Sequence, residues 1–193
     1  MTLACAIPFH ELLDFELRLR KLFAEAAEDL SPGEADGAMP LRLVVPRWLK
    51  GHAMEERLCA WIGETYAGLF GGVETVADGD TLALYELVRG LQETAEGHRF
   101  TVGAIDSYMD AGLLDLLALN DRVLKRGTPH GLVPGEACVL VMLGTGEAGT
   151  HPPLGSLRAV FNSFEPESLS APQGIIGRGL ARSLRQALDS FVP

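Results

Sequence analysis

Cysteine is scarce in this chain. Only three of the 193 residues are cysteines, Cys5, Cys59 and Cys138, and their spacing suggests no pair. An odd number without paired spacing argues against a disulfide framework and indicates reduced thiols, so we expect a cytoplasmic protein. A chain of this length can bury a sizeable core without disulfide bonds.

Positive charge is also in short supply. The 16 lysines and arginines face 26 acidic residues, which gives a net charge of −10. Such an excess repels phosphate backbones and anionic lipid surfaces, so we expect neither a nucleic acid nor a membrane as partner. The opening stretch "MTLACAIPFHELLDFELRL" has no basic segment followed by an apolar one. We therefore expect no signal peptide and no membrane span.

Metal-ligand spacing is missing as well. The sequence contains five scattered histidines, namely His10, His52, His98, His130 and His151. Without the short spacings that zinc sites use, they indicate no metal site, and no motif points to a cofactor.

Hydrophobic residues are plentiful, at 47% of the chain, and their spacing predicts helices and strands. Apolar residues at helical spacing predict helices over 9–30, 52–70, 81–95 and 175–191. The glycine pair at 71–72 should stop the second of these. Short β-favouring runs predict strands at "LRLVVP" (41–46), "VETVA" (73–77), "RFTVGAI" (99–105), "ACVLVML" (137–143) and "GSLRAVF" (155–161).

The order of these elements predicts an α/β fold in three layers. "RFTVGAI" and "ACVLVML" do not alternate cleanly between apolar and polar residues, which is typical of strands covered on both faces. We therefore expect the first four strands to form one mixed sheet between helices.

The stretch "LVPGEACVLVML" combines a tight turn with a carboxylate. Pro134 fixes φ and Gly135 permits a sharp turn, so Glu136 should lie at the mouth of the following strand. We favour a structural role in which the Glu136 carboxylate accepts backbone N–H bonds and holds the turn. A catalytic acid is the alternative, but no second carboxylate or histidine has a fixed place nearby. If Gly135 has a positive φ, Gly135→Val should destabilise the protein.

Two further stretches are similar in sequence to catalytic loops. "GTGEAGTH" (144–151) resembles a Gly-Thr active-site loop, and "FNSF" (161–164) resembles an Asn-Ser-Phe turn. Both adjoin predicted strands, and the first lacks the lysine and following helix of a phosphate loop, so we interpret them as connections.

Three arginines recur at helical spacing in the last predicted helix. Arg178, Arg182 and Arg185 fall on one face. We favour a solvated face, and the alternative is a docking patch for an acidic partner.

The stretches "TVGAIDSYMD" and "LVPGEACVLVML", separated by a helical segment, together resemble the thiolase-like β-ketoacyl synthases. In that family a strand ending in Gly-Gly-(Val/Ile)-Asp leads through a helical excursion to a Gly-Phe-Val-x-Gly-Glu-Gly turn. That turn enters the last strand of the first half of the fold. The resemblance covers residues 40–145, with matching places at Gly103, Asp106, Gly131, Pro134, Gly135 and Glu136.

The resemblance places the family's nucleophile at Ala77. In ketosynthases a cysteine lies there, on a sharp turn at a helix N-terminus, where the helix dipole stabilises the thiolate. The resemblance therefore implies that this chain has no catalytic nucleophile. Asp78 and Asp80 follow, and their charge would raise the pKa of a neighbouring thiol.

The resemblance also implies a domain organisation. Residues 1–145 would correspond to the later part of a thiolase-like first half, and 146–193 to the beginning of a second half, together in one compact domain. The family's two catalytic histidines belong to the second half. His151 and Asn162 precede the core of that half and are not equated with them.

We therefore hypothesise a non-catalytic scaffold or partner in acyl-thioester metabolism of the fatty-acid or polyketide type. The alternatives are a ketosynthase-type acyltransferase completed by another polypeptide, and a segment of a longer enzyme. The expected partners are a second copy or a ketosynthase-like chain, with an acyl carrier protein as a further candidate. In this family the strand before the nucleophile pairs with its twin, here 73–77. The rival interpretation is that the charge of Glu74 prevents pairing at this edge and keeps the chain monomeric.

Overall fold

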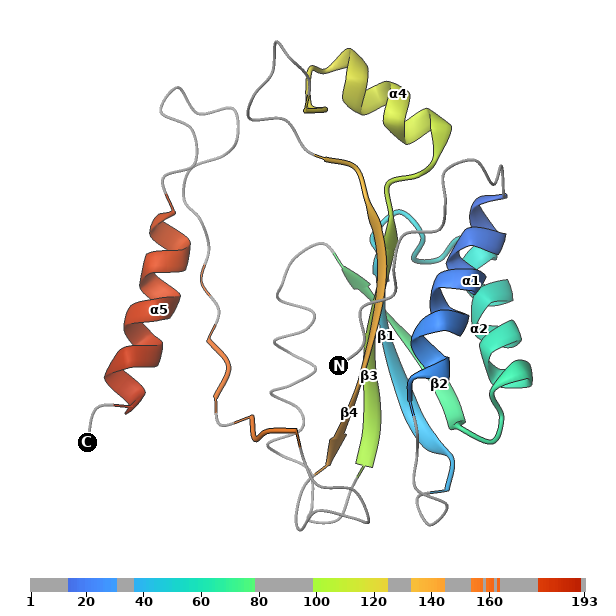
Figure 1. The fold of residues 1–193 in the computed structure, drawn as a ribbon, viewed down its shortest axis with the longest axis horizontal. Helices are drawn as coiled ribbons and strands as arrows, with labels where there is room; N and C mark the ends of the chain where they lie inside the picture. The colour runs from blue at the N-terminus through green and yellow to red at the C-terminus, as the bar shows by residue number, and fades with distance from the viewer. Residues whose placement is uncertain are drawn as a thin grey trace.

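The computed structural model describes residues 14–30, 37–78, 99–124, 133–144, 154–157, 159–161, 163 and 177–191 (Figure 1). Their elements, in chain order, are α1 (Phe15–Glu28), β1 (Met39–Pro46), α2 (Ala53–Thr65), β2 (Phe70–Asp78), β3 (Arg99–Ser107), α4 (Ala111–Leu119), β4 (Glu136–Gly144) and α5 (Arg178–Phe191).

The four strands form one mixed sheet in the order β2-β1-β3-β4. β1 pairs in parallel with both β2 and β3, and β4 runs antiparallel to β3. The prediction that these four segments share a mixed sheet is confirmed. The sheet order places β2 and β4 at its two edges within the described part.

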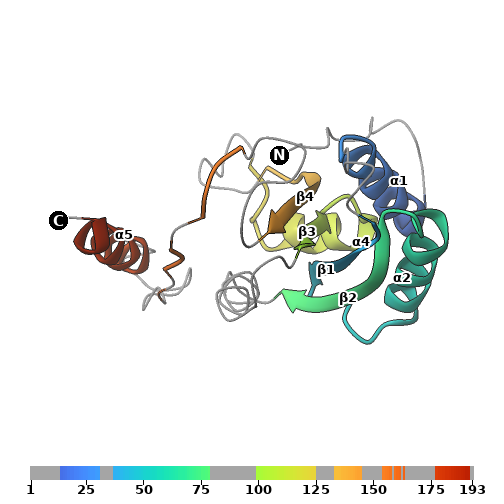
Figure 2. The same cartoon turned by 90° about the horizontal axis from the view of Figure 1, so that it is seen from below.

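Helices α1 and α2 cover one face of this sheet, as Figures 1 and 2 both show. α1 packs against β3 and β4, and α2 packs against β2. The core between them consists of fully buried side chains, including Leu19, Phe23, Leu41, Leu43, Leu58 and Ile62. On the other face Val44, Phe100 and Val102 form a smaller cluster. The helix predicted at 81–95 lies outside the described residues, so the third layer stays a prediction.

The end of α2 differs from its prediction. The helix stops at Thr65, and the amide of Phe70 donates to the carbonyl of Tyr66 at 2.8 Å in the turn that follows. β2 then begins at Phe70 because that residue pairs with Met39 of β1. Gly71 and Gly72 therefore lie inside a strand, and the prediction that they stop the helix is wrong.

The strand predicted at 155–161 is also wrong. Residues 155–157 and 159–161 have no regular structure. A β-favouring composition forms a strand only where a neighbouring strand offers hydrogen bonds, and β4 pairs with β3 alone in the described sheet. Val160 instead packs its side chain against the smaller cluster of Val44, Phe100 and Val102.

Candidate functional site

The carboxyl ends of the parallel strands β1, β2 and β3 lie at one edge of the sheet. In open α/β sheets ligands bind outside the carboxyl ends of the strands. Ala77, the position to which the sequence resemblance assigns a nucleophile, is the second-last residue of β2 and lies opposite Val45 in register. β3 ends at the same edge with Ser107, which pairs with Glu136 at the start of β4.

Glu136 lies in a buried polar cluster at this edge. Its carboxylate receives two hydrogen bonds from Arg18 of α1, from Nε to Oε2 at 3.0 Å and from Nη2 to Oε1 at 2.7 Å. Ser107 Oγ donates to Oε2 at 3.0 Å and accepts from the amide of Met109 at 3.1 Å. The side chains of Arg18 and Glu136 are only 5% and 0% exposed.

This geometry supports the structural interpretation of Glu136, but the partners differ from those predicted. The carboxylate binds a guanidinium and a hydroxyl, whereas the sequence suggested backbone N–H groups. Both carboxylate oxygens are occupied by Arg18, an α-helical residue 118 positions away in the sequence. The ion pair therefore joins α1 to the start of β4 at this edge of the sheet, and it holds the buried carboxylate against Arg18.

The turn before Glu136 needs no unusual backbone. Gly135 is not among the residues with positive φ, and a Cβ built there would meet no atom within 4 Å. The condition on which Gly135→Val was expected to destabilise the protein is therefore not met. The amide of Tyr108 donates to the carbonyl oxygen of Gly135 at 2.9 Å, and this bond ties the turn to the end of β3.

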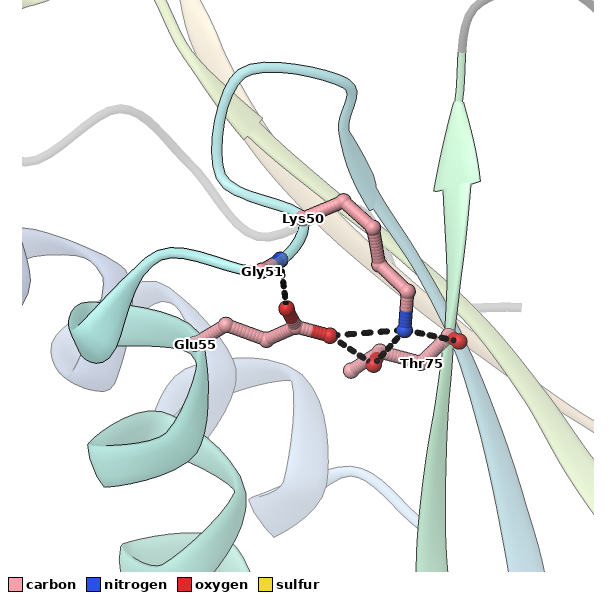
Figure 3. A network of polar contacts seen from close by, with 4 residues as sticks. All are labelled: Lys50, Gly51, Glu55 and Thr75. Atoms are coloured by element: carbon pink, nitrogen blue, oxygen red, sulfur yellow. Dashed lines mark hydrogen bonds and ion pairs between the residues drawn. The ribbon is translucent and has the colours of Figure 1, made fainter.

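A second polar cluster links the turn after β1 with α2 and β2 (Figure 3). Lys50 Nζ donates to Glu55 Oε1 at 2.8 Å, to Thr75 Oγ1 at 2.8 Å and to the main-chain oxygen of Thr75 at 2.9 Å. Glu55 also accepts from the amide of Gly51 and from Thr75 Oγ1. Sequence reasoning missed this cluster, because only the parallel pairing of β1 with β2 brings Thr75 to the β1–α2 turn.

The two described thiols are held in the protonated form. Burial, and then the charge of Glu55, raise the pKa of Cys59 against the opposing effects of Lys50 and Thr75. Burial raises the pKa of Cys138 to about 12. Since the thiolate is the nucleophilic form, neither thiol is set up to act as a nucleophile. Cys5 lies outside the described residues.

Of the five histidines, His52 is the one that the structure describes. His52 caps α2, where its Nδ1 accepts from the amide of Met54 at 3.2 Å. The other four histidines, Asn162 and most of the "GTGEAGTH" stretch lie outside the described residues. Within the described ranges, no group of three or more His, Cys, Asp or Glu side chains could hold a metal ion. No helix in that part of the chain is long and apolar enough to cross a membrane.

The Lys50–Glu55–Thr75 cluster predicts a pH dependence of stability. Desolvation raises the pKa of Glu55, but hydrogen bonds from Lys50, Thr75 and Gly51 outweigh it, so the pKa lies below the ordinary 4.5. A lowered carboxyl pKa stabilises the fold above about 4.5, and this contribution is lost as the pH falls through the folded-state pKa. The free energy of unfolding of Glu55→Gln should therefore fall furthest below that of the unmodified protein near neutral pH.

Urea unfolding at a series of pH values measures this difference. The gap between the two proteins should narrow as the pH falls below about 4.5. Glu56→Gln removes one charge from an exposed position in the same helical turn and serves as the matched control. A gap that stays constant from neutral to acid pH would contradict the role assigned to Glu55.

No family model matches the chain, and a search of curated proteins finds no match to it.

Proposed function

We propose that the chain is a non-catalytic thiolase-like scaffold, a partner protein in acyl-thioester metabolism. The observation that carries this proposal is the state of the motif carboxylate. Glu136 resembles the glutamate of the family's Gly-Glu-Gly turn, and both of its carboxylate oxygens accept hydrogen bonds from the buried Arg18. A carboxylate so paired and buried is suited to holding α1 and β4 together and poorly placed to meet a ligand.

The packing of the other motif residues supports the same proposal. Gly103 of β3 lies between Leu43 of β1 and Leu140 of β4 in register. A Cβ on Gly103 would come within 2.5 Å of Leu140 Cδ2, so the glycine serves close packing of the sheet. Scaffold residues of the motif are thus in structural use, while the nucleophile position holds an alanine.

Incubation with an acyl thioester tests the proposal directly. Intact-mass spectrometry should find no acyl adduct on the unmodified protein, and a malonyl thioester should not be turned over. Ala77→Cys alone should also fail to condense acyl groups, since the resemblance gives this chain no counterpart of the family's two catalytic histidines. The aspartates at positions 78 and 80 of the sequence should also raise the pKa of the new thiol. The rate of alkylation of the new thiol by a neutral reagent gives an independent measure of its thiolate fraction. Turnover by the unmodified chain would overturn the proposal.

A scaffold of this kind acts through association, and the proposed contact is β2 against β2 of a second copy or of a ketosynthase-like chain. Among the strands that the structure describes, β2 lies at the end of the sheet order, so it offers an edge for strand pairing. Glu74 does not shield that edge alone, because its carboxylate lies 3.3 Å from Arg42 Nε on the neighbouring strand. An acyl carrier protein is a further proposed partner.

Sedimentation velocity at micromolar concentration tests the β2 contact. The unmodified protein should self-associate, and Glu74→Pro should weaken this association because proline removes a strand N–H. Glu74→Gln keeps the N–H and removes the charge, so it should leave the association unchanged. Circular dichroism of each variant verifies the fold. A monomeric unmodified protein, or an association constant that Glu74→Pro leaves unchanged, would argue against this contact.

A further inference from the structure

Helix α5 exposes a row of leucines that no described residue covers. Leu180, Leu184 and Leu188 recur every four residues, so they lie one above the other on one face. Their exposed fractions are 67%, 55% and 67%. The adjoining face holds the exposed Arg185, three residues before Leu188. The helix contacts the rest of the protein elsewhere, through Ser183, whose hydroxyl lies 2.7 Å from that of Ser163.

Helix α4 exposes a complementary face. None of its residues is buried, although its sequence "AGLLDLLAL" is almost entirely apolar. Leu116 and Leu119 are 57% and 84% exposed, and Asp115 lies four residues before Leu119 on the same side. Asp110 caps the helix, accepting from the amide of Leu113 at 2.9 Å. The exposed face of α4 is therefore apolar and acidic.

The charges of the two helices are opposite. α5 carries three arginines and one aspartate, a net charge of +2 within a chain of net charge −10, so the other residues sum to −12. α4 carries an aspartate and no basic residue. The leucines of α5 thus lie beside arginines, and the exposed leucines of α4 lie beside an aspartate. Figures 1 and 2 show the two helices well apart, so they do not cover each other within one copy.

We propose that the leucine face of α5 docks on α4 of a second copy of this chain. Rows of side chains three and four residues apart are the ridges through which helices pack. The row from Leu180 to Leu188 is about 12 Å long, and α4 is about 14 Å long, so one helix can cover the other. In this arrangement Arg185 lies beside the Asp115 of the other copy. If each copy gives its α5 to the other, two such contacts close a symmetric dimer.

An anionic lipid surface is the other occupant that a basic amphipathic helix could fit. The net charge of −10 disfavours it, because the protein as a whole is repelled from such a surface. A lipid surface would also leave Leu116 and Leu119 of α4 uncovered. The second copy accounts for both exposed faces, and its contact uses no residue of β2.

Charge reversal at Arg185 and Asp115 tests the contact by sedimentation velocity over a concentration series. Arg185→Glu and Asp115→Arg should each weaken self-association about tenfold, because each places like charges across the contact. An equimolar mixture of the two variants should recover the affinity, since each α5 then meets an α4 of opposite charge. Arg47→Glu, at an exposed turn outside both helices, makes the same charge change as Arg185→Glu and should leave the affinity unchanged.

Three results would overturn the proposal. The first is an unmodified protein that stays monomeric at tens of micromolar. The second is an equimolar mixture of the two variants whose affinity stays as weak as that of each variant alone. The third is sedimentation of the protein with phosphatidylglycerol vesicles that Arg185→Glu abolishes. The Glu74→Pro variant separates this contact from the one proposed for β2: its remaining self-association should still respond to Arg185→Glu.

Discussion

Replacing Glu136 with alanine should lower the free energy of unfolding by about 3–5 kcal/mol, the cost of breaking a buried ion pair from one side. The change removes the carboxylate that binds Nε and Nη2 of Arg18, and Arg18 is only 4% exposed. A guanidinium that stays buried without its carboxylate destabilises the folded state, because the free energy of removing its charge from water is no longer offset by the ion pair. The loss also removes the ion pair that joins α1 to the start of β4.

Urea unfolding followed by circular dichroism measures this loss. The matched control is the double variant Arg18→Met with Glu136→Leu, in which apolar side chains of similar volume replace both charges. Such replacements are often close to neutral, so most of the stability should return. Ser107→Ala, which removes one hydrogen bond to Glu136, should cost about 1 kcal/mol. A double variant as unstable as Glu136→Ala would show that the site needs the charges themselves.

The strands could be predicted because local sequence and tertiary pairing agree there. Runs such as "LRLVVP" and "ACVLVML" contain mainly β-branched and large apolar residues, and each lies in the sheet as expected. Their faces follow from the period of two: Leu41 and Leu43 point into the core with α1 and α2, while Val44 packs in the opposite cluster.

The site could be predicted only in part. The sequence places Glu136 at the mouth of a strand, but its partner Arg18 is 118 residues away on a helix that precedes the sheet. One signal was present: Arg18 lies four residues before Leu22, on the apolar side of α1. A charge on the buried side of a helix calls for a buried partner of opposite sign. Only the fold shows which of the 26 acidic residues it is.

Glycine was the least predictable residue. Gly71 and Gly72 read as a helix stop, yet they belong to β2, since pairing with β1 outweighs a local preference. For Gly135 the sequence left a positive φ open, and the structure gives it neither a positive φ nor a close neighbour for a Cβ. The glycine whose missing side chain the fold does use is Gly103. Its role follows from cross-strand neighbours that the sequence alone does not pair.

Gly103→Ala should destabilise the protein by about 1–3 kcal/mol, because it adds a methyl group to a filled part of the core. Leu43, Gly103 and Leu140 lie in one row across β1, β3 and β4. A Cβ on Gly103 would lie 2.5 Å from Leu140 Cδ2, 3.0 Å from Leu43 Cδ1 and 3.4 Å from the carbonyl oxygen of Val139. Both leucines are at most 2% exposed, so neither can turn toward solvent to make room.

A double-mutant cycle with Leu140 separates crowding from a loss of strand propensity. Leu140→Ala alone should cost about 2–5 kcal/mol through the cavity it leaves, but it also removes the atom that a Cβ on Gly103 would strike. The pair Gly103→Ala with Leu140→Ala should therefore cost less than the sum of the two single changes. Gly135→Ala, where the added methyl group meets nothing within 4 Å, should stay within about 0.5 kcal/mol of the unmodified protein. Strict additivity at Gly103 and Leu140 would mean that the two side chains do not compete for the same space, and the close packing of β3 between its neighbours would lose its physical basis.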